Sequence, residues 1–242
     1  MDKKESSHAT SMTMASGEWK DHVAKGLARL SVQADAGMID CLARHSKEML
    51  QWNKTTNLTA ITDPIDVAVK HVIDSGAAVP HIPHAATVLD LGTGGGYPGI
   101  PLKILIPSID ITLVDASRKK VNFLKQVIRS LSLTKAHAIQ ARGEELAKES
   151  DYQNRFDVVI SRAFSGLDVF VPMALPFLKD DGVIIAMKGR ETEQEKFLLQ
   201  TLVCTLADGR VIRAGDLDLE LITYRLPYLD SERALMIIRI EK

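Results

Sequence analysis

The chain has 242 residues, of which 45% are hydrophobic and 25% charged, a composition typical of a globular protein that can bury a sizeable core. Its formal net charge is −1, so a nucleic-acid partner would have to be bound by a local basic patch. No run of about 18 apolar residues is present, which predicts that no segment spans a membrane.

Residues 1–17 are polar and lack the apolar stretch of a signal peptide, so we interpret them as a flexible leader. The two cysteines, Cys41 and Cys204, lie far apart and have no metal-ligand spacing. They favour a reducing, cytoplasmic setting without a disulfide framework, and each is expected to pack within a helix.

Residues 18–80 are predicted to form a helical cap. Apolar residues recur at helical spacing in two segments, at Trp19, Val23, Leu27 and Leu30 and then at Ile39, Leu42, Met49 and Leu50. A third helix, from about Pro64 to Ser75, begins after the N-cap signal at Asp63. The proline-containing "VPHIPHAA" that follows indicates a linker into a second unit, residues 81–242.

In this second unit, strands alternate with helices, which is typical of a parallel sheet covered on both faces. We predict seven strands, parallel except for the last: "TVLDLG", "IDITLVD", "KAHAIQA", "FDVVIS", "GVIIAMKG", "LDLELITYRL" and "ALMIIRI". The expected helices are one opened by Pro98 and Pro101, then "VNFLKQVIRSL", "GEELAKES", "LDVFVPMALPFL" and "EQEKFLLQTLVCTL". The last two strands are expected to form an antiparallel pair at one edge.

The stretch "LDLGTGGGYPGIP", residues 89–101, follows the first of these strands, where open α/β sheets bind small ligands. Gly92, Gly94 and Gly96 permit backbone angles and close approaches that a side chain would block. A purely structural turn needs one or two glycines, so the five glycines of this stretch predict a ligand-binding loop.

Two classes of ligand fit the loop. Gly94, Gly96 and Gly99 match the dinucleotide pattern G-x-G-x-x-G, and Asp115 lies where a ribose-binding acid would follow. However, Asp90 beside the loop would repel the phosphates of a dinucleotide, whereas it would attract the ammonium and sulfonium of S-adenosylmethionine. We therefore favour the methyl donor and keep an NAD-dependent oxidoreductase as the alternative.

Several motifs then resemble one bacterial family. "LDLGTGGGYPGIPLKI", "TLVDASRKKVNFLKQV", "ARGEE", "FDVVISRAF" and "MKG" occur in this order, preceded by "WNKTTNLTAI" and "KHVIDS". Together they resemble the ribosomal RNA small-subunit methyltransferase G family, also called glucose-inhibited division protein B, over residues 45–190. The last 50 residues match only in general pattern.

The resemblance implies a Rossmann-like class I S-adenosylmethionine-dependent methyltransferase that methylates a guanine N7 in 16S ribosomal RNA, in a hairpin near the decoding centre. It also implies that Gly92 and Tyr97 contact the donor, that Gly143 and Glu144 lie near its adenine, and that Arg162 contributes after the fourth strand. Tyr97 and Gly143 stand where relatives often have other residues, but neither difference removes a backbone contact.

The chemistry agrees with this target. Guanine N7 carries a lone pair and no proton, so the enzyme has mainly to align two reactants. The chain has "SRAF" where amino-group methyltransferases have an acid-Pro-Pro-aromatic tetrad, and no cysteine near that strand end for a covalent mechanism. These absences favour a ring nitrogen or a hydroxyl as the acceptor.

Basic side chains are expected to hold the RNA. Arg162 and Lys188, at strand ends on the rim of the glycine loop, are the candidate catalytic residues. Arg190 lies close by in sequence, and a further group follows Asp115: Arg118, Lys119, Lys120, Lys125 and Arg129. This further group could equally form a solvated helix face.

The remaining expectations concern partners. Trp52 and His71 are interpreted as packing residues. Because no carboxylate or cysteine lies at metal-ligand spacing from His71, we predict no metal site. We expect a cytoplasmic monomer that acts on 16S ribosomal RNA or on the small subunit. A non-catalytic RNA-binding assembly factor that retains the donor site as a relic is a second alternative.

Overall fold

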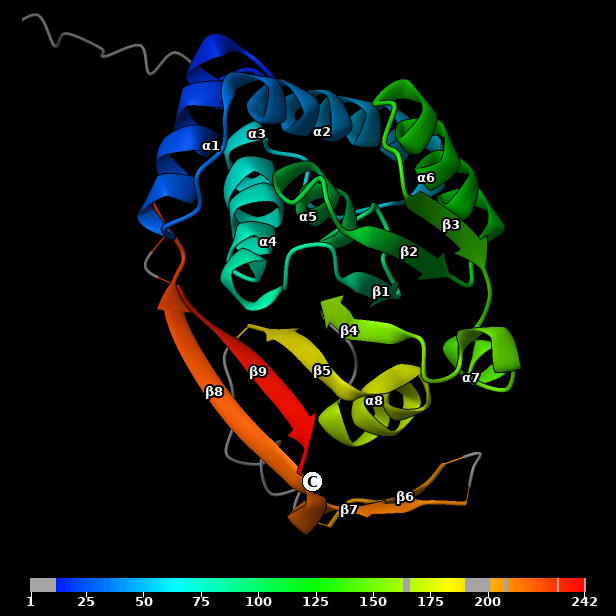
Figure 1. Cartoon of the computed structure of the whole chain (residues 1–242). Helices are drawn as coiled ribbons and strands as arrows, with labels where there is room; N and C mark the ends of the chain where they lie inside the picture. Colours follow the sequence, from blue (N-terminus) through cyan, green and yellow to red (C-terminus); the bar gives the residue numbers. More distant parts are fainter. Residues whose placement is uncertain (1–11, 163–165, 190–200, 207–208, 230, 242) are drawn as a thin grey trace, which may run out of the picture.

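A computed structural model describes residues 12–162, 166–189, 201–206, 209–229 and 231–241 (Figure 1). Its centre is a seven-stranded sheet with the strand order β3-β2-β1-β4-β5-β9-β8. The strands are β1 (Thr87–Leu91), β2 (Asp110–Asp115), β3 (Ala136–Gln140), β4 (Phe156–Arg162), β5 (Leu178–Lys188), β8 (Leu217–Arg225) and β9 (Glu232–Ile240).

The strand directions in this sheet agree with the sequence. Strands β1 to β5 pair in parallel, and β9 runs antiparallel to both of its neighbours, β5 and β8. Because β1 pairs with β2 on one side and with β4 on the other, the strand order reverses at β1. The loops after β1 and β4 therefore border the crevice where such sheets bind ligands.

The first face of the sheet is covered by the N-terminal helices together with α5 and α6 (Figure 1). They are α1 (Gly17–Arg29), α2 (Ala36–Thr56), α3 (Pro64–Val67), a π-helix (Ala68–Ile73), α4 (Asp74–Gly76), α5 (Gly99–Leu105) and α6 (Arg118–Ser130). The side chains of Ser16, Asp35 and Asp63 cap α1, α2 and α3 by accepting hydrogen bonds from amides of the first helical turn.

The opposite face packs a second apolar cluster beneath shorter elements. These are α7 (Gly143–Leu146), α8 (Leu167–Ala174) and the 3₁₀ turns Ser150–Tyr152 and Leu175–Phe177. Two further 3₁₀ turns, Val79–His81 and Ala214–Asp216, lie in connections, and β6 (Val203–Thr205) pairs with β7 (Val211–Arg213) in a separate two-stranded sheet.

The helix predicted over residues 193–206 is wrong at its C-terminal end, and residues 193–200 lie outside the described part of the chain. Val203–Thr205 is a strand, so Cys204 packs in a strand, whereas Cys41 lies in α2 as expected. The β-branched Val203 and Thr205 favour a strand, and Gly209, at φ +86°, permits the turn towards β7. The helix predicted over residues 167–178 is also shorter, because α8 ends at Ala174, two residues before Pro176, while Pro172 lies inside it.

One apolar cluster joins the N-terminal helices to the sheet. It includes Trp19 and Leu42 of the helices together with Ile111 and Leu113 of β2. The described end of the predicted leader, residues 12–16, places Met12 and Met14 against the same cluster. The division into a leader (1–17), a cap (18–80) and a methyltransferase domain (81–242) stays a prediction.

Candidate functional site

The glycine-rich loop joins β1 to α5 at the carboxyl end of the sheet. Gly92, Gly94 and Gly96 have φ angles of +74°, +58° and +86°, a region that L-residues with side chains rarely adopt. The amides of Gly92 and Thr93 both donate to the carbonyl of Val114, at 2.9 and 3.1 Å. The loop is therefore fastened to the end of β2.

These glycines serve different purposes. Gly92 is exposed, and a Cβ there would meet no atom within 4 Å, so its backbone is open to a ligand. Gly96 is buried, and a Cβ would lie 2.7 Å from Cγ1 of Ile100 and 3.1 Å from Nε2 of His45. Its amide donates to Thr93 and its carbonyl accepts from Ile100. Gly96 thus serves helix packing, which differs from its predicted role as a cofactor contact.

Asp90 does not face the loop's open side, and this corrects our prediction. Its side chain is fully buried, and Oδ2 accepts a hydrogen bond from the Gly99 amide at 2.9 Å. Burial raises the pKa of Asp90 to about 6, although the Gly99 hydrogen bond favours the charged form. Asp90 therefore holds the start of α5, and its charge no longer serves to distinguish a methyl donor from a dinucleotide.

Asp115 is the carboxylate that does lie at the loop. It ends β2, with Oδ2 accepting from the Gly94 amide at 3.1 Å and Oδ1 from the Ser117 amide at 2.8 Å. Lys120 Nζ lies 3.8 Å from Oδ2. Since a carboxylate offers about four acceptor positions, Asp115 retains capacity for two ligand hydroxyls.

A cavity of about 170 Å³ opens beside Asp115. Four of the predicted cofactor residues line it: Gly92, Asp115, Gly143 and Glu144. The rest of the wall includes the apolar side chains of Leu91, Val114 and Met173. A Cβ on Gly143 would collide with Met173, so glycine at this position allows the methionine to close the cavity. An acceptor for hydroxyls beside an apolar slot fits a ribose attached to a flat heterocycle.

Arg162, at the end of β4, is held by the N-terminal helical segment. Its Nη1 donates to the carbonyl of Lys70 at 3.0 Å and lies 3.7 Å from Oδ2 of Asp74. Its Nη2 donates to Nδ1 of His71 at 3.0 Å. The π-helix Ala68–Ile73 presents this carbonyl and this imidazole together, and such π-helical turns are frequent at functional sites.

Tyr97 packs between two histidines beneath the loop. Its ring centroid lies 4.7 Å from that of His45 and 4.6 Å from that of His71. The guanidinium carbon of Arg162 lies over the ring, 5.3 Å from its centroid. The hydroxyl is 3.3 Å from Oγ of Ser46, and burial raises the pKa of Tyr97 to about 12. The side chain of Tyr97 therefore connects the loop to α2 and to Arg162, and it does not line the cavity.

Comparison with known proteins identifies the family. The profile of rRNA small subunit methyltransferase G matches residues 38–212. The chain belongs to the rRNA small subunit methyltransferase G family. A protein of this name from Geobacter sp. (strain M21) is 40% identical over 219 residues, which are 90% of this chain and 96% of the relative. Another, from Desulfitobacterium hafniense (strain Y51), is 38% identical over 77% of this chain and 80% of the relative.

Solved structures agree with the fold expected for this family. A SAM dependent methyltransferase from Aquifex aeolicus superposes with a TM-score of 0.52 at 14% identity, covering 79% of this chain and 98% of that one. A predicted O-methyltransferase from Agrobacterium tumefaciens gives 0.51 at 16% identity, covering 71% and 80%. The predicted Rossmann-like methyltransferase fold and the family resemblance are both confirmed.

The other predicted basic residues of this methyltransferase G chain that the structure describes lie on β5 and α6. Lys188 ends β5, one residue beyond Met187, which pairs with Arg162 of β4. Arg190 lies outside the described residues. Of the basic group on α6, Lys120 is half-buried near Asp115, and the others are exposed: Arg118, Lys119, Lys125 and Arg129.

Two kinds of feature are absent from the residues that the structure describes. In that part of the chain, no group of three or more His, Cys, Asp or Glu is placed to hold a metal ion. No helix of the same part is long and apolar enough to cross a membrane.

Sequence reasoning missed the residues that surround Arg162 and Tyr97. Asp74 is buried, accepts from Tyr224 Oη at 2.8 Å, and lies 3.8 Å from Nε of Arg233. His45 Nε2 lies 2.9 Å from the carbonyl of Gly95 and so contacts the loop from α2. The available signal was His71 and Asp74 in a helical segment with many apolar residues. Spacing could not predict their contacts, because Tyr224 lies 150 residues from Asp74 and Gly95 lies 50 residues from His45.

Proposed function

We propose that this chain transfers the methyl group of S-adenosylmethionine to N7 of a guanine in 16S ribosomal RNA. The observation that carries the proposal is the cavity beside Asp115, which adjoins the open backbone of Gly92 where the strand order reverses. Membership of the methyltransferase G family supports the RNA substrate.

The residues of the cavity fit the donor. Asp115 has free acceptor positions for the two ribose hydroxyls, and the apolar wall with Gly143 and Glu144 suits the adenine. The exposed backbone of Gly92 leaves room for the methionine part. We retain Asp115, Gly92, Gly94, Gly143 and Glu144 as candidate cofactor contacts. Tyr97 does not line the cavity, and we propose that it supports the loop from beneath and contacts Arg162.

The chemistry needs alignment more than acid–base groups. When bound, the donor supplies an electrophilic methyl group on a sulfonium. The lone pair of guanine N7 forms the new N–C bond as the S–C bond breaks, and the bonding electrons go to sulfur. No proton has to leave N7, so the protein's task is to hold both reactants in line. We propose that Arg162 and Lys188, at the ends of adjacent strands, position the target nucleotide.

The finer statements about partners are also proposals. We propose that the protein acts as a cytoplasmic monomer, without a metal ion, on 16S ribosomal RNA or the assembled small subunit. The presence of two unpaired, half-buried cysteines, Cys41 and Cys204, agrees with a reducing compartment. Light scattering of the purified protein at several concentrations tests the monomer, since a dimer would double the mass.

The test of function is methyl transfer to small subunits from cells that lack this protein, with a radiolabelled methyl donor. Label at guanine N7, located by mass spectrometry of nucleosides and fragments, is the expected result. Label on another atom would overturn the N7 assignment. Donor binding without transfer would favour the assembly factor, and binding of NADH in place of the methyl donor would favour the oxidoreductase.

A further inference from the structure

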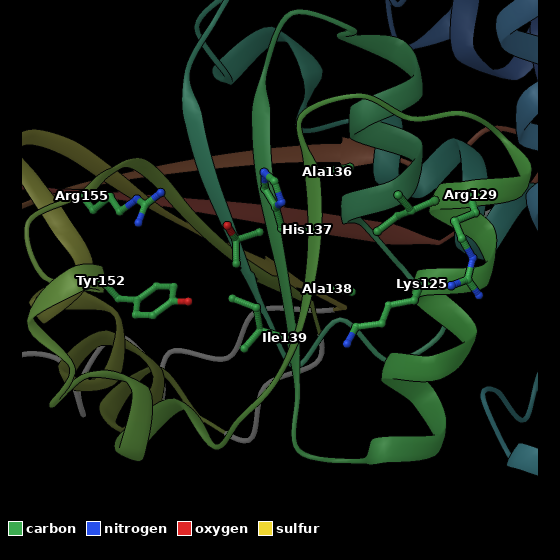
Figure 2. Close-up of a pocket in the computed structure, with 10 residues that line it drawn as sticks. Lys125, Arg129, Ala136, His137, Ala138, Ile139, Tyr152 and Arg155 are labelled. Atoms are coloured by element: carbon green, nitrogen blue, oxygen red, sulfur yellow. The ribbon is translucent and has the colours of Figure 1, made fainter.

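A larger cavity, of about 550 Å³, lies along the edge strand β3, outside the site described above. Figure 2 shows Lys125 and Arg129 on α6 at one side of the strand, and Tyr152 and Arg155 at the other. We call this feature the β3 groove. It is formed by residues 136–139 of β3 together with Lys125, Arg129, Tyr152 and Arg155.

The cations of the β3 groove are not neutralised. No carboxylate is among the residues that line it, and within the described chain Lys125, Arg129 and Arg155 form no ion pair. Arg129 instead donates to the amide oxygen of Gln126 at 3.2 Å, and Arg155 donates to the carbonyl of Asp151 at 3.1 Å. Some cations elsewhere in the described chain do have acidic partners, as Lys179 has in Asp157.

The groove thus concentrates positive charge on a chain whose net charge is −1. Lys125 and Arg129 are four residues apart on α6, so they project from the same side of the helix. His137 of β3 also lines the groove, with Nε2 3.5 Å from Oδ1 of Asp110. The electrostatic field of these cations can attract a polyanion locally, although the net charge of the whole molecule is slightly negative.

Two further features of the groove suit a nucleic acid. In the described part of the chain, β3 pairs only with β2, so its outer edge presents backbone groups that can bond to phosphate or sugar oxygens. Tyr152 is half-buried, and the guanidinium carbon of Arg155 lies 5.8 Å from its ring centroid. Aromatic and guanidinium planes are common stacking surfaces for unpaired RNA bases.

The groove lies close to the donor cavity along the chain. Ile139 lines the groove and Ala141 lines the cavity, and two residues of extended chain span about 7 Å. We propose that the β3 groove binds the sugar–phosphate backbone of the RNA substrate beside the target nucleotide, which rests on the proposed function. An extended peptide could also pair with the edge of β3, but cations on both walls favour the polyanion.

The test compares two double variants with equal loss of charge. Lys125→Ala/Arg155→Ala removes a cation from each wall of the groove. Lys25→Ala/Lys47→Ala removes two exposed lysines, one from α1 and one from α2, that form no ion pair within the described residues. Affinity for a transcript of 16S ribosomal RNA is measured between 0.05 and 0.3 M salt, together with donor affinity and Tm.

Each lost phosphate contact should weaken binding about fivefold in roughly 0.15 M salt, because each contributes a slope of about 0.7 to 0.9 in log K against log salt. The groove variant should therefore bind the transcript about 25-fold more weakly, with a slope shallower by about 1.5. Donor affinity and Tm should match the wild type, and the control should change less than about threefold.

Equal losses for the two double variants would overturn the proposal, because general charge would then explain both. Unchanged affinity for the bare transcript with weakened affinity for the assembled subunit would also overturn it and indicate a protein partner. These measurements do not depend on turnover. If the wild type binds the transcript through the groove yet transfers no methyl group, the proposed function fails and the groove stands.

Discussion

The guanidinium of Arg162 donates through Nη2 to Nδ1 of His71 across 3.0 Å, and this contact joins the end of β4 to the N-terminal helices. A guanidinium can only donate, so Nδ1 is the acceptor and the ring proton resides on Nε2, which donates to Thr59 Oγ1 at 2.8 Å. Burial and the charge of Arg162 lower the pKa of His71 to about 3. His71 is therefore a neutral positioning residue for Arg162.

Replacing His71 should test this role. In His71→Ala, Arg162 loses one of its acceptors, and we expect kcat/KM for methyl transfer to fall about tenfold, with about 2 to 3 kcal/mol lost in the free energy of unfolding. His71→Asn keeps an amide oxygen near the Nδ1 position, so it should recover much of the transfer activity. Equal activity of the two variants, at protein concentrations corrected for the folded fraction, would contradict a positioning role.

Asp115 should be the carboxylate on which donor binding depends. Asp115→Asn removes the charge that strengthens hydrogen bonds to ribose hydroxyls, and calorimetry should show donor affinity at least about tenfold weaker. Asp110→Asn, on the same strand but half-exposed, is the matched control and should bind the donor as the wild type does. A normal affinity for Asp115→Asn would remove Asp115 from the site.

The sequence predicted the sheet well because strand and helix signals are local. The glycine loop, the N-cap at Asp63 and the reversed last strand all followed from short patterns. Asp90 was misplaced because proximity in sequence does not tell which side of a loop a strand residue faces. Its side chain lies beneath the loop, where it accepts from Gly99. Likewise, the polar contacts of Asp74 with Tyr224 and Arg233 depend on β8 and β9 returning beside the N-terminal helices.

Two glycines of the loop should separate binding from folding. Gly92→Ala meets no atom within 4 Å, so it adds only backbone strain of about 1 kcal/mol while placing a methyl group where we propose the donor binds. Gly96→Ala has similar backbone strain and also collides with Ile100. We expect Gly92→Ala to lose donor affinity at nearly normal Tm.

Gly96→Ala should instead lose about 2 to 4 kcal/mol in the free energy of unfolding, because overpacking adds to the strain. Urea denaturation measures this quantity for both variants. The opposite pattern, with Gly92→Ala the less stable and Gly96→Ala the weaker donor binder, would show that the two glycines had been assigned to the wrong roles.

Asp90 should make the protein less stable as the pH rises. Its pKa is raised by burial from about 3.8 when unfolded to about 6 when folded, so the folded state holds the proton more tightly. This contribution to stability is present below pH 3.8 and is lost as the pH rises through 6. The buried histidines act in the opposite sense, because the pKa of His45 is lowered to about 4 and their protonation destabilises the fold in acid.

Comparison of Asp90→Asn with the wild type isolates the carboxylate, because the histidines contribute equally to both proteins. The free energy of unfolding of the variant, relative to wild type, should rise by about 2.4 kcal/mol between pH 4 and pH 8, with most of the change between pH 4 and 6. Urea denaturation at intervals of half a pH unit measures it. A difference that stays constant over this pH range would show that Asp90 is not buried against α5.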